Sequence, residues 1–364
     1  SVGGILANQP RIDFTGGGCG SLLLEGSRTN VITHSEYIKG IGPTQNMTLL
    51  NNASVNPQGL QYATEAVPFQ NISTHIFFKS GMGNAANTFT QSIYAKANGY
   101  NFCFIRFDSP TTYAWFDLEN GVVGQTQSGI TSTIVDAGNG WYRCTATLTT
   151  TQYANAVIGV SNQDGTAVFA ANGTSSVLFW GWQSELGSYP TSLIPTYGTS
   201  VTRAGDVCGK TGVSSLIGQN EGSYFIEFQA KRLDEVYSMF SISDGSNNNR
   251  IQLTLFDSGT TPRIGFFYIV NAVNGFQDAN IQDLVEGQTY KFAVTYTQSS
   301  LSGYLDGTQI INETGLSLSG GSFDRIAYGL RPSSTSFRFN MPVKQTLVFN
   351  TALSDAELAE LTTI

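Results

Sequence analysis

The sequence predicts an all-β protein made of two tandem antiparallel β-sandwiches, with one short helix near the C-terminus. Strand-like segments alternate with turns rich in Gly, Asn, Ser and Thr at intervals of about ten residues, which is typical of sandwiches and barrels. Charged residues are only 12% of the chain, glycines number 40, and aromatic residues reach 12%. With 364 residues, the chain is long enough for two domains that each bury their own core.

The strand signals fall into two groups. In the first half we expect strands at 90–96, 101–108, 113–118, 141–150, 156–161 and 176–182. In the second half we expect them at 224–230, 238–243, 250–256, 263–270, 290–297, 301–305, 325–329 and 344–349. The intervening segment 187–198 carries two prolines and two glycines, which cannot continue a central strand, so it marks the domain boundary.

Two local motifs define the C-terminal part. Asp306-Gly307 lies between strand-like residues and predicts a two-residue hairpin turn, because such turns need positive φ angles. Ser354 and Glu357 form a capping-box pattern that opens a short helix. A hairpin, further strands and one small closing helix resemble the laminin-G-like, concanavalin A-type lectin sandwich over most of residues 222–364. The resemblance implies binding rather than catalysis.

The ends of the first half carry a second resemblance. Pro10-Arg11-Ile12-Asp13-Phe14-Thr15 with the following Ser21–Asn30 segment, and the exit from Trp180-Gly181-Trp182 through Val201-Thr202-Arg203-Ala204, are similar to bacteriophage virion proteins with carbohydrate-binding-type jelly rolls. The position of Trp182 more often carries a small residue in those proteins. The resemblance implies an N-terminal arm over 1–30, a jelly roll over 31–203 and a laminin-G-like domain over 204–364.

That resemblance also implies partners and a location. Such domains belong to tail fibres, tail spikes or head fibres that contact a host surface, so we expect a virion protein that binds host-surface polysaccharide and other virion proteins, commonly as a homotrimer. A secreted bacterial carbohydrate-binding or polysaccharide-degrading protein, and a purely structural fibre or capsid segment, are the alternatives. The chain starts at Ser1 without a signal-peptide pattern, and we expect it to be part of a longer protein.

Charge and hydropathy exclude two partner classes. The net charge of −8 and the absence of a Lys/Arg cluster argue against nucleic acid. No apolar run approaches the ~20 residues of a membrane span, so we expect no membrane insertion.

Catalytic patterns are scarce. The chain has two histidines, His34 and His75, and neither has metal-spaced neighbours. The G-x-S-x-G elbow of hydrolases and the E-x-D-x-x-E strand of concanavalin-type glucanases are missing. Of the three strand motifs of a jelly-roll polysaccharide lyase, only one has a partial match, in the segment 77–81. We therefore expect no enzymatic activity, with lyase or hydrolase activity as the alternative.

Binding chemistry is better supplied. Sugars present apolar C–H faces and hydroxyl groups, which match an aromatic plane beside Asn, Asp, Gln or Arg. The period of two in 113–118 places Tyr113, Trp115 and Asp117 on one face and the core residues on the other. We expect these three and Trp182 to contact carbohydrate. The alternative is that both faces of this strand are covered by other parts of the protein.

In the second domain, Arg263, Tyr268 and Asn271 are candidate rim residues for carbohydrate. Asp244, Asn247 and Asn249 are candidates for binding a structural calcium ion, because their turn is rich in oxygen ligands, although it lacks EF-hand spacing. We expect no other cofactor.

The four cysteines, Cys19, Cys103, Cys144 and Cys208, are scattered and show no C-x-x-C spacing. Reduced, buried thiols are the favoured interpretation. Cys103 and Cys144 both lie in strand-like segments, so pairing between them stays open.

Overall fold

A computed structural model describes residues 11–13, 20–83, 86–108, 111–206, 208–230, 237–257, 261–285, 287–329 and 342–363. These residues form antiparallel sheets and one α-helix, which confirms the predicted all-β class of two sandwiches with a short C-terminal helix. Two compact units can be distinguished. The first spans 28–203, and the second combines the described residues of 11–27 with those of 204–363.

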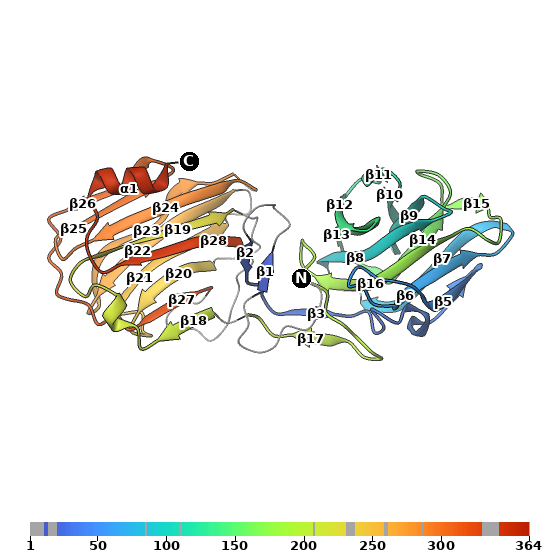
Figure 1. The fold of residues 1–364 in the computed structure, drawn as a ribbon, viewed down its shortest axis with the longest axis horizontal. Coiled ribbons are helices and arrows are strands. Elements are labelled where there is room, and N and C mark those ends of the chain that lie inside the picture. Colours follow the sequence, from blue (N-terminus) through green and yellow to red (C-terminus); the bar gives the residue numbers. More distant parts are fainter. Residues whose placement is uncertain are drawn as a thin grey trace. The chain divides into compact units, whose positions relative to one another are not determined.

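Two sheets build the first unit, and Figure 1 shows their strands. One sheet runs in the order β11 (Val122–Thr126), β10 (Thr112–Asp117), β9 (Phe102–Asp108), β14 (Tyr153–Ser161), β7 (Ile72–Gly83) and β15 (Val168–Ala170), with β4 (Thr44–Gln45) also paired to β7. The other runs β12 (Ile130–Gly138), β13 (Trp141–Thr150), β8 (Asn87–Asn98), β16 (Ser176–Leu186), β6 (Ala63–Pro68) and β5 (Met47–Ser54). Outside these sheets lie the pair β3 (Arg28–Asn30) and β17 (Val201–Arg203) and the 3-10 helix η1 (Ile38–Ile41).

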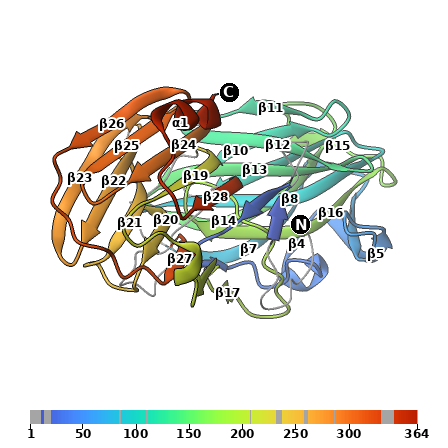
Figure 2. The ribbon, with the colours of Figure 1, turned by 60° about the vertical axis from the view of Figure 1, so that its left-hand side comes forward.

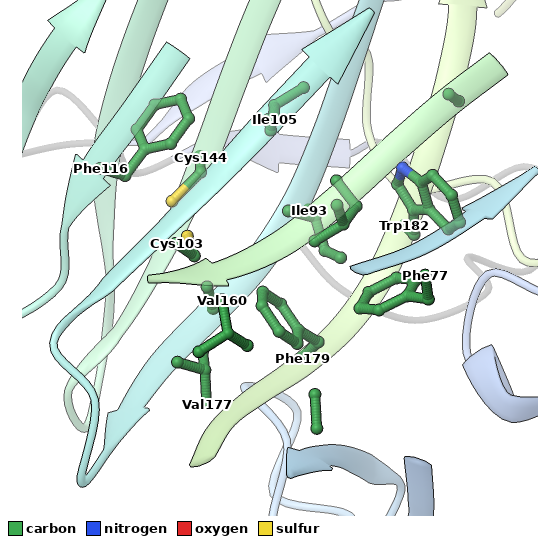
Figure 3. Close-up of a cluster of buried hydrophobic side chains, with 14 of the residues drawn as sticks. Phe77, Ile93, Cys103, Ile105, Phe116, Cys144, Val160, Val177, Phe179 and Trp182 are labelled. Carbon is green, nitrogen blue, oxygen red and sulfur yellow. The ribbon is translucent and has the colours of Figure 1, made fainter. Parts of the chain in front are cut away.

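The core of the first unit lies between its two sheets. Because side chains alternate along a strand, every second residue of β9 and β10 points inward, as do Val177 and Phe179 of β16. Phe116, Ile105 and Phe179 are among the fully buried members of this cluster. Figure 3 shows them interleaved with aliphatic side chains from both sheets.

The second unit is also a two-sheet sandwich. One sheet runs β1 (Arg11–Asp13), β2 (Ser21–Leu23), β28 (Pro342–Phe349), β19 (Gly222–Gln229), β24 (Thr289–Tyr296), β25 (Ser300–Leu305) and β26 (Thr308–Thr314). The other runs β18 (Cys208–Thr211), β27 (Arg325–Tyr328), β20 (Tyr237–Ser243), β21 (Arg250–Asp257), β22 (Pro262–Val270) and β23 (Val273–Asp283). A 3-10 turn, η2 (Ser214–Leu216), precedes β19.

Part of the predicted N-terminal arm belongs to the second unit. Leu22 of β2 pairs with Val343 of β28, and Leu24 is buried in the core of this sandwich. Arg11 forms ion pairs with the carboxylates of Glu25 and Asp206. Along the sequence, the first unit therefore follows β1 and β2 and precedes the remaining strands of the second sandwich.

The C-terminal motifs form as their residues predict. Asp306 and Gly307 have φ angles of 46° and 79° and turn β25 into β26. The side chain of Ser354 accepts a hydrogen bond from the N–H of Glu357, and the Glu357 carboxylate accepts one from the N–H of Ser354, which completes the capping box of α1 (Asp355–Thr362). Leu358 of α1 is buried against Phe225 and Ala293 of β19 and β24. Figure 2 shows α1 beside the sheet that contains these strands. Among the described residues, no helix has the length and apolar character needed to cross a membrane.

Candidate functional site

The outer face of β10 carries a separate aromatic cluster. Ala114, Phe116 and Leu118 belong to the interior of the sandwich, whereas Tyr113 and Trp115 pack with Phe104 and Val157 on the opposite side of the sheet. The faces predicted from the period of two are therefore correct. Gly159 leaves room for the Phe104 ring, since a Cβ at this position would lie 2.0 Å from the ring.

Trp115 is covered on this outer face. Only 4% of the residue is exposed, and its indole stacks on the Tyr113 ring with centroids 4.8 Å apart. Ala167, from the segment between β14 and β15, packs against the same cluster. Asp164 of that segment accepts a hydrogen bond from the backbone N–H of Gln125 in β11 at 2.8 Å, which holds the segment across the sheet. Trp115 therefore supports Tyr113 and does not present a free ring, which corrects the predicted contact role.

Polar side chains adjoin the half-buried Tyr113. The guanidinium carbon of Arg106 lies 5.6 Å from the centroid of the Tyr113 ring, and Arg106 Nε is 2.8 Å from Oδ1 of Asp108. Asn155 Nδ2 donates to Oδ2 of Asp108 at 3.0 Å. These contacts follow from the strand register, which places Tyr113 opposite Arg106 and Asn155 opposite Asp108. We call Tyr113, Arg106, Asp108 and Asn155 the Tyr113 surface.

The Tyr113 surface can bind a polar ligand that has an apolar face. The aromatic ring offers a plane for stacking, the guanidinium and the amide can donate hydrogen bonds, and the carboxylate can accept them. All four residues are half-buried, so their side chains reach solvent while the surrounding packing restricts them. Mutual contacts fix the orientation of the polar groups before any ligand arrives, which lowers the entropic cost of binding.

Asp117 has a different role from the one predicted. Its Oδ1 accepts hydrogen bonds from the N–H groups of Glu119 and Asn120 at 2.9 and 3.0 Å, and its Oδ2 accepts one from the Asn120 side chain. Partial burial favours a higher pKa for Asp117, but the hydrogen bonds from Asn120 and Glu119 outweigh it, and the pKa is lowered from 3.8. This carboxylate closes the turn between β10 and β11.

Trp182 is a core residue, which corrects the prediction that it contacts carbohydrate. It is fully buried between the sheets, meets Phe77 edge-on at 5.3 Å, and donates from Nε1 to Gln91 at 3.4 Å. Gly181, with φ of 65°, forms a bulge at which the register with β8 shifts. The extra residue places Trp180 on the outer side of this sheet and Trp182 on the inner side.

The candidates in the second domain do not come together. Arg263 lies near the start of β22 and pairs with Asp283 at 2.6 Å, whereas Asn271 follows the other end of that strand, roughly 25 Å away at ~3.3 Å per residue. Tyr268 is 2% exposed and donates its hydroxyl hydrogen to the carbonyl of Thr297. The predicted rim of Arg263, Tyr268 and Asn271 is therefore wrong as a single site.

The predicted calcium turn is held by its own hydrogen bonds. Asp244 accepts from the N–H of Ser246 at 2.7 Å and from Asn249 Nδ2 at 2.9 Å, while Asn249 Oδ1 accepts from the N–H of Asn271. Partial burial favours a higher pKa for Asp244, but the Ser246 and Asn249 hydrogen bonds lower it overall. In the part of the chain that the structure describes, no group of three His, Cys, Asp or Glu residues could hold a metal ion. The hydrogen bonds of Asp244 and Asn249 close this turn, and the calcium assignment of Asp244, Asn247 and Asn249 stays a prediction.

Arg106, Asp108 and Asn155 were missed by the sequence analysis. A signal for two of them exists, because Arg106 and Asp108 alternate with Phe107 inside a strand of a chain with few charges. A paired Arg and Asp on the same side of a strand indicates a solvent-facing polar site. Asn155 carries no comparable signal, since its neighbourhood depends on the pairing of β14 with β9.

The fold and site define an all-β protein of two antiparallel sandwiches with an aromatic and polar surface on the first. No protein-family model matches the chain, and no curated protein matches it. Among solved structures, it is similar to the NanB sialidase from Streptococcus pneumoniae at 16% identity and a TM-score of 0.36, covering 43% of this chain and 26% of the sialidase.

Two further structures show a comparable likeness. The CBM40 domain of the Ruminococcus gnavus IT-sialidase matches at 15% identity and a TM-score of 0.33, covering 43% of this chain and 94% of that domain. A SAP-like pentraxin from Limulus polyphemus matches at 12% identity and a TM-score of 0.31, covering 38% and 68%. Similarity at this level carries no argument about ligand or activity.

Proposed function

We propose that the protein is a non-catalytic adhesion module that binds carbohydrate through the Tyr113 surface. The observation that carries this proposal is the half-buried Tyr113 ring, stacked on buried Trp115 and bordered by the Arg106–Asp108 pair and Asn155. An oriented aromatic plane beside fixed donors and acceptors matches the alternating apolar faces and hydroxyl rim of a sugar.

We further propose that the module belongs to a bacteriophage virion and contacts a polysaccharide of the host surface. The sequence resemblance at both ends of the first domain supports this assignment. A homotrimer fits this role, since three copies of a weak site bind a repetitive polymer together. In the structure β28 pairs with β2 of the same chain, so this edge needs no strand from a sister chain. Light scattering tests the trimer, and a monomer at micromolar concentration contradicts it.

The binding test compares Tyr113→Ala with the parent protein on host cells and on purified surface polysaccharide. Loss of one stacked ring is worth about 1–2 kcal/mol, so we expect roughly tenfold weaker binding by a single site. Tyr113→Phe keeps the ring and should retain most of the affinity. Tyr197→Ala is the control, because Tyr197 is 73% exposed and lies outside the Tyr113 surface.

Three results would contradict the proposal. If folded Tyr113→Ala binds as tightly as the parent, the Tyr113 surface is not the binding site. Loss of binding in Tyr197→Ala alone moves the site to the region of that residue. Shortening of the polysaccharide by the parent protein on prolonged incubation shows that the module is an enzyme and favours the polysaccharide-degrading alternative.

A further inference from the structure

Cys103 and Cys144 face each other across the interior of the first unit. Cys103 lies on β9 and Cys144 on β13, which belong to different sheets, and both residues are fully buried. Figure 3 shows their sulfur atoms pointing toward one another. The strand neighbours of the two cysteines are the apolar Phe116, Val160, Ile134 and Ile93. Each thiol therefore has the other as its nearest reactive partner on these strands.

The two sheets approach each other between β9 and β13. Cα atoms of β9 and β13 approach within 8 Å, whereas packed sheets usually lie about 10 Å apart. A disulfide joins residues whose Cα atoms are roughly 4.4–6.8 Å apart, so it requires two strands that approach each other closely. Burial raises the pKa of the Cys144 thiol well above its ordinary value, and a hydrogen bond and charge repulsion from the neighbouring Cys103 raise it further. This influence agrees with the sulfur atoms that face each other in Figure 3.

We propose that Cys103 and Cys144 form a disulfide site that links the two sheets of the first sandwich when the protein meets an oxidising disulfide such as glutathione disulfide. This inference does not depend on carbohydrate binding. The two described cysteines of this unit are the proposed pair, whereas Cys208 belongs to the second unit and Cys19 lies outside the described residues.

The chemistry needs one external disulfide for each bond. One cysteine loses its proton, and its thiolate attacks a sulfur of the reagent, forming a mixed disulfide and releasing one glutathione thiolate. The thiolate of the second cysteine then attacks the first cysteine's sulfur and displaces the other glutathione. The released thiolates take up the two protons. The protein loses two electrons and two hydrogens, and the reagent is reduced to two thiols.

The burial of the two thiols determines when the disulfide can form. The thiolate is the nucleophile, and full burial in apolar surroundings disfavours it, so the folded protein reacts slowly. The bond should form during folding in an oxidising buffer and much more slowly in protein that is already folded. Once formed, it closes a loop of about forty residues and restricts the unfolded chain.

The test uses the full chain refolded with glutathione disulfide and, in parallel, with reduced glutathione. After denaturation in maleimide without reductant, the oxidised sample should carry two labels and the reduced sample four, one for each cysteine of the sequence. Peptide mapping should find the segments of Cys103 and Cys144 joined, with a mass lower by two hydrogens. The melting temperature of the oxidised sample should rise by roughly 5–15 °C.

Matched variants identify the pair. Cys103→Ala and Cys144→Ala should each abolish the redox-dependent rise in melting temperature, whereas Cys208→Ser should keep it. If an alanine variant does not fold, peptide mapping of the parent still decides. Four labels after refolding with glutathione disulfide, or a bridge that involves Cys19 or Cys208 in place of this pair, would overturn the proposal.

Discussion

The ring of Tyr113 stacks on the indole of Trp115, with their planes 13° from parallel. The two residues are two positions apart on β10, so both side chains leave the sheet on the same side. Trp115 is almost fully buried, whereas Tyr113 is half-buried, so the Trp115 indole lies beneath the Tyr113 surface and supports it. The orientation of the Tyr113 ring, through which we propose that carbohydrate binds, therefore depends on its buried neighbour Trp115.

Replacing Trp115 should affect both stability and binding. Trp115→Ala removes a large buried side chain, and we expect it to cost about 3–5 kcal/mol of unfolding free energy and to weaken binding because Tyr113 loses its support. In Trp115→Phe both effects should be smaller. Phenylalanine keeps an aromatic floor and removes an indole N–H that has no hydrogen-bond partner among the described residues. Urea unfolding and polysaccharide binding measure the two effects; a fully stable Trp115→Ala would mean that the residue is not buried.

Trp182→Ala should destabilise the first unit without a separate effect on the Tyr113 surface. It leaves a cavity between the sheets and removes the edge contact with Phe77, at a cost of about 3–5 kcal/mol. A thermal scan should show a melting temperature lower by roughly 10 °C or more. Below that temperature the folded variant should bind like the parent. Weak binding by a well-folded Trp182→Ala would restore the contact role that its burial excludes.

The Asp117 carboxylate should make the stability of the first unit depend on pH in acid. Its pKa is lower in the folded state than its ordinary 3.8, so its contribution is fully present above that value and is lost as the pH falls through the folded pKa. Asp117→Asn should therefore be less stable than the parent at pH 7, and the difference should vanish in strong acid. Urea midpoints of both proteins between neutral pH and about pH 2 measure this. A difference that stays constant with pH would show that the charge of Asp117 is unimportant for the turn.

Removing residues 1–27 should destabilise the second sandwich. The deletion takes away β1 and β2, removes Leu24 from the core, and exposes the β28 edge. Loss of the buried Leu24 side chain alone is worth about 2–5 kcal/mol. Calorimetry should show a lower transition for the second unit while the first unit keeps its transition. An unchanged second transition would mean that the pairing of β2 with β28 contributes nothing to stability.

Local geometry decided which features could be predicted from the sequence. The Asp306-Gly307 turn, the capping box of Ser354 and the two faces of β10 depend on neighbours within a few residues, and all three form as expected. The buried cluster that contains Trp115 also includes Ile76 and Val157, with Ala167 packed against it; these residues are distant in sequence, so no local pattern shows the burial of Trp115. At Trp182 a local signal exists, because a glycine between two tryptophans in a strand favours a bulge, and the bulge reverses the faces.

The predicted rim on the second domain failed for a related reason. Alternation alone places Arg263 and Tyr268 on opposite faces of β22, and the length of the strand separates Arg263 from Asn271. Residue type suggested a site that strand geometry does not allow. Asn155 illustrates the opposite case, since it joins Asp108 only through the register of β14 with β9. Such long-range pairing is set by the whole sheet.

The pairing of β2 with β28 also sets the order in which the molecule can be completed during synthesis. The ribosome releases β2 early, but its partner Val343 emerges only after the whole of the first sandwich and most of the second. The first sandwich contains all of its own strands between 28 and 203 and can fold while β2 still waits. A chain that ends before residue 342 lacks β28 and therefore lacks the strand of the second sandwich with which β2 pairs.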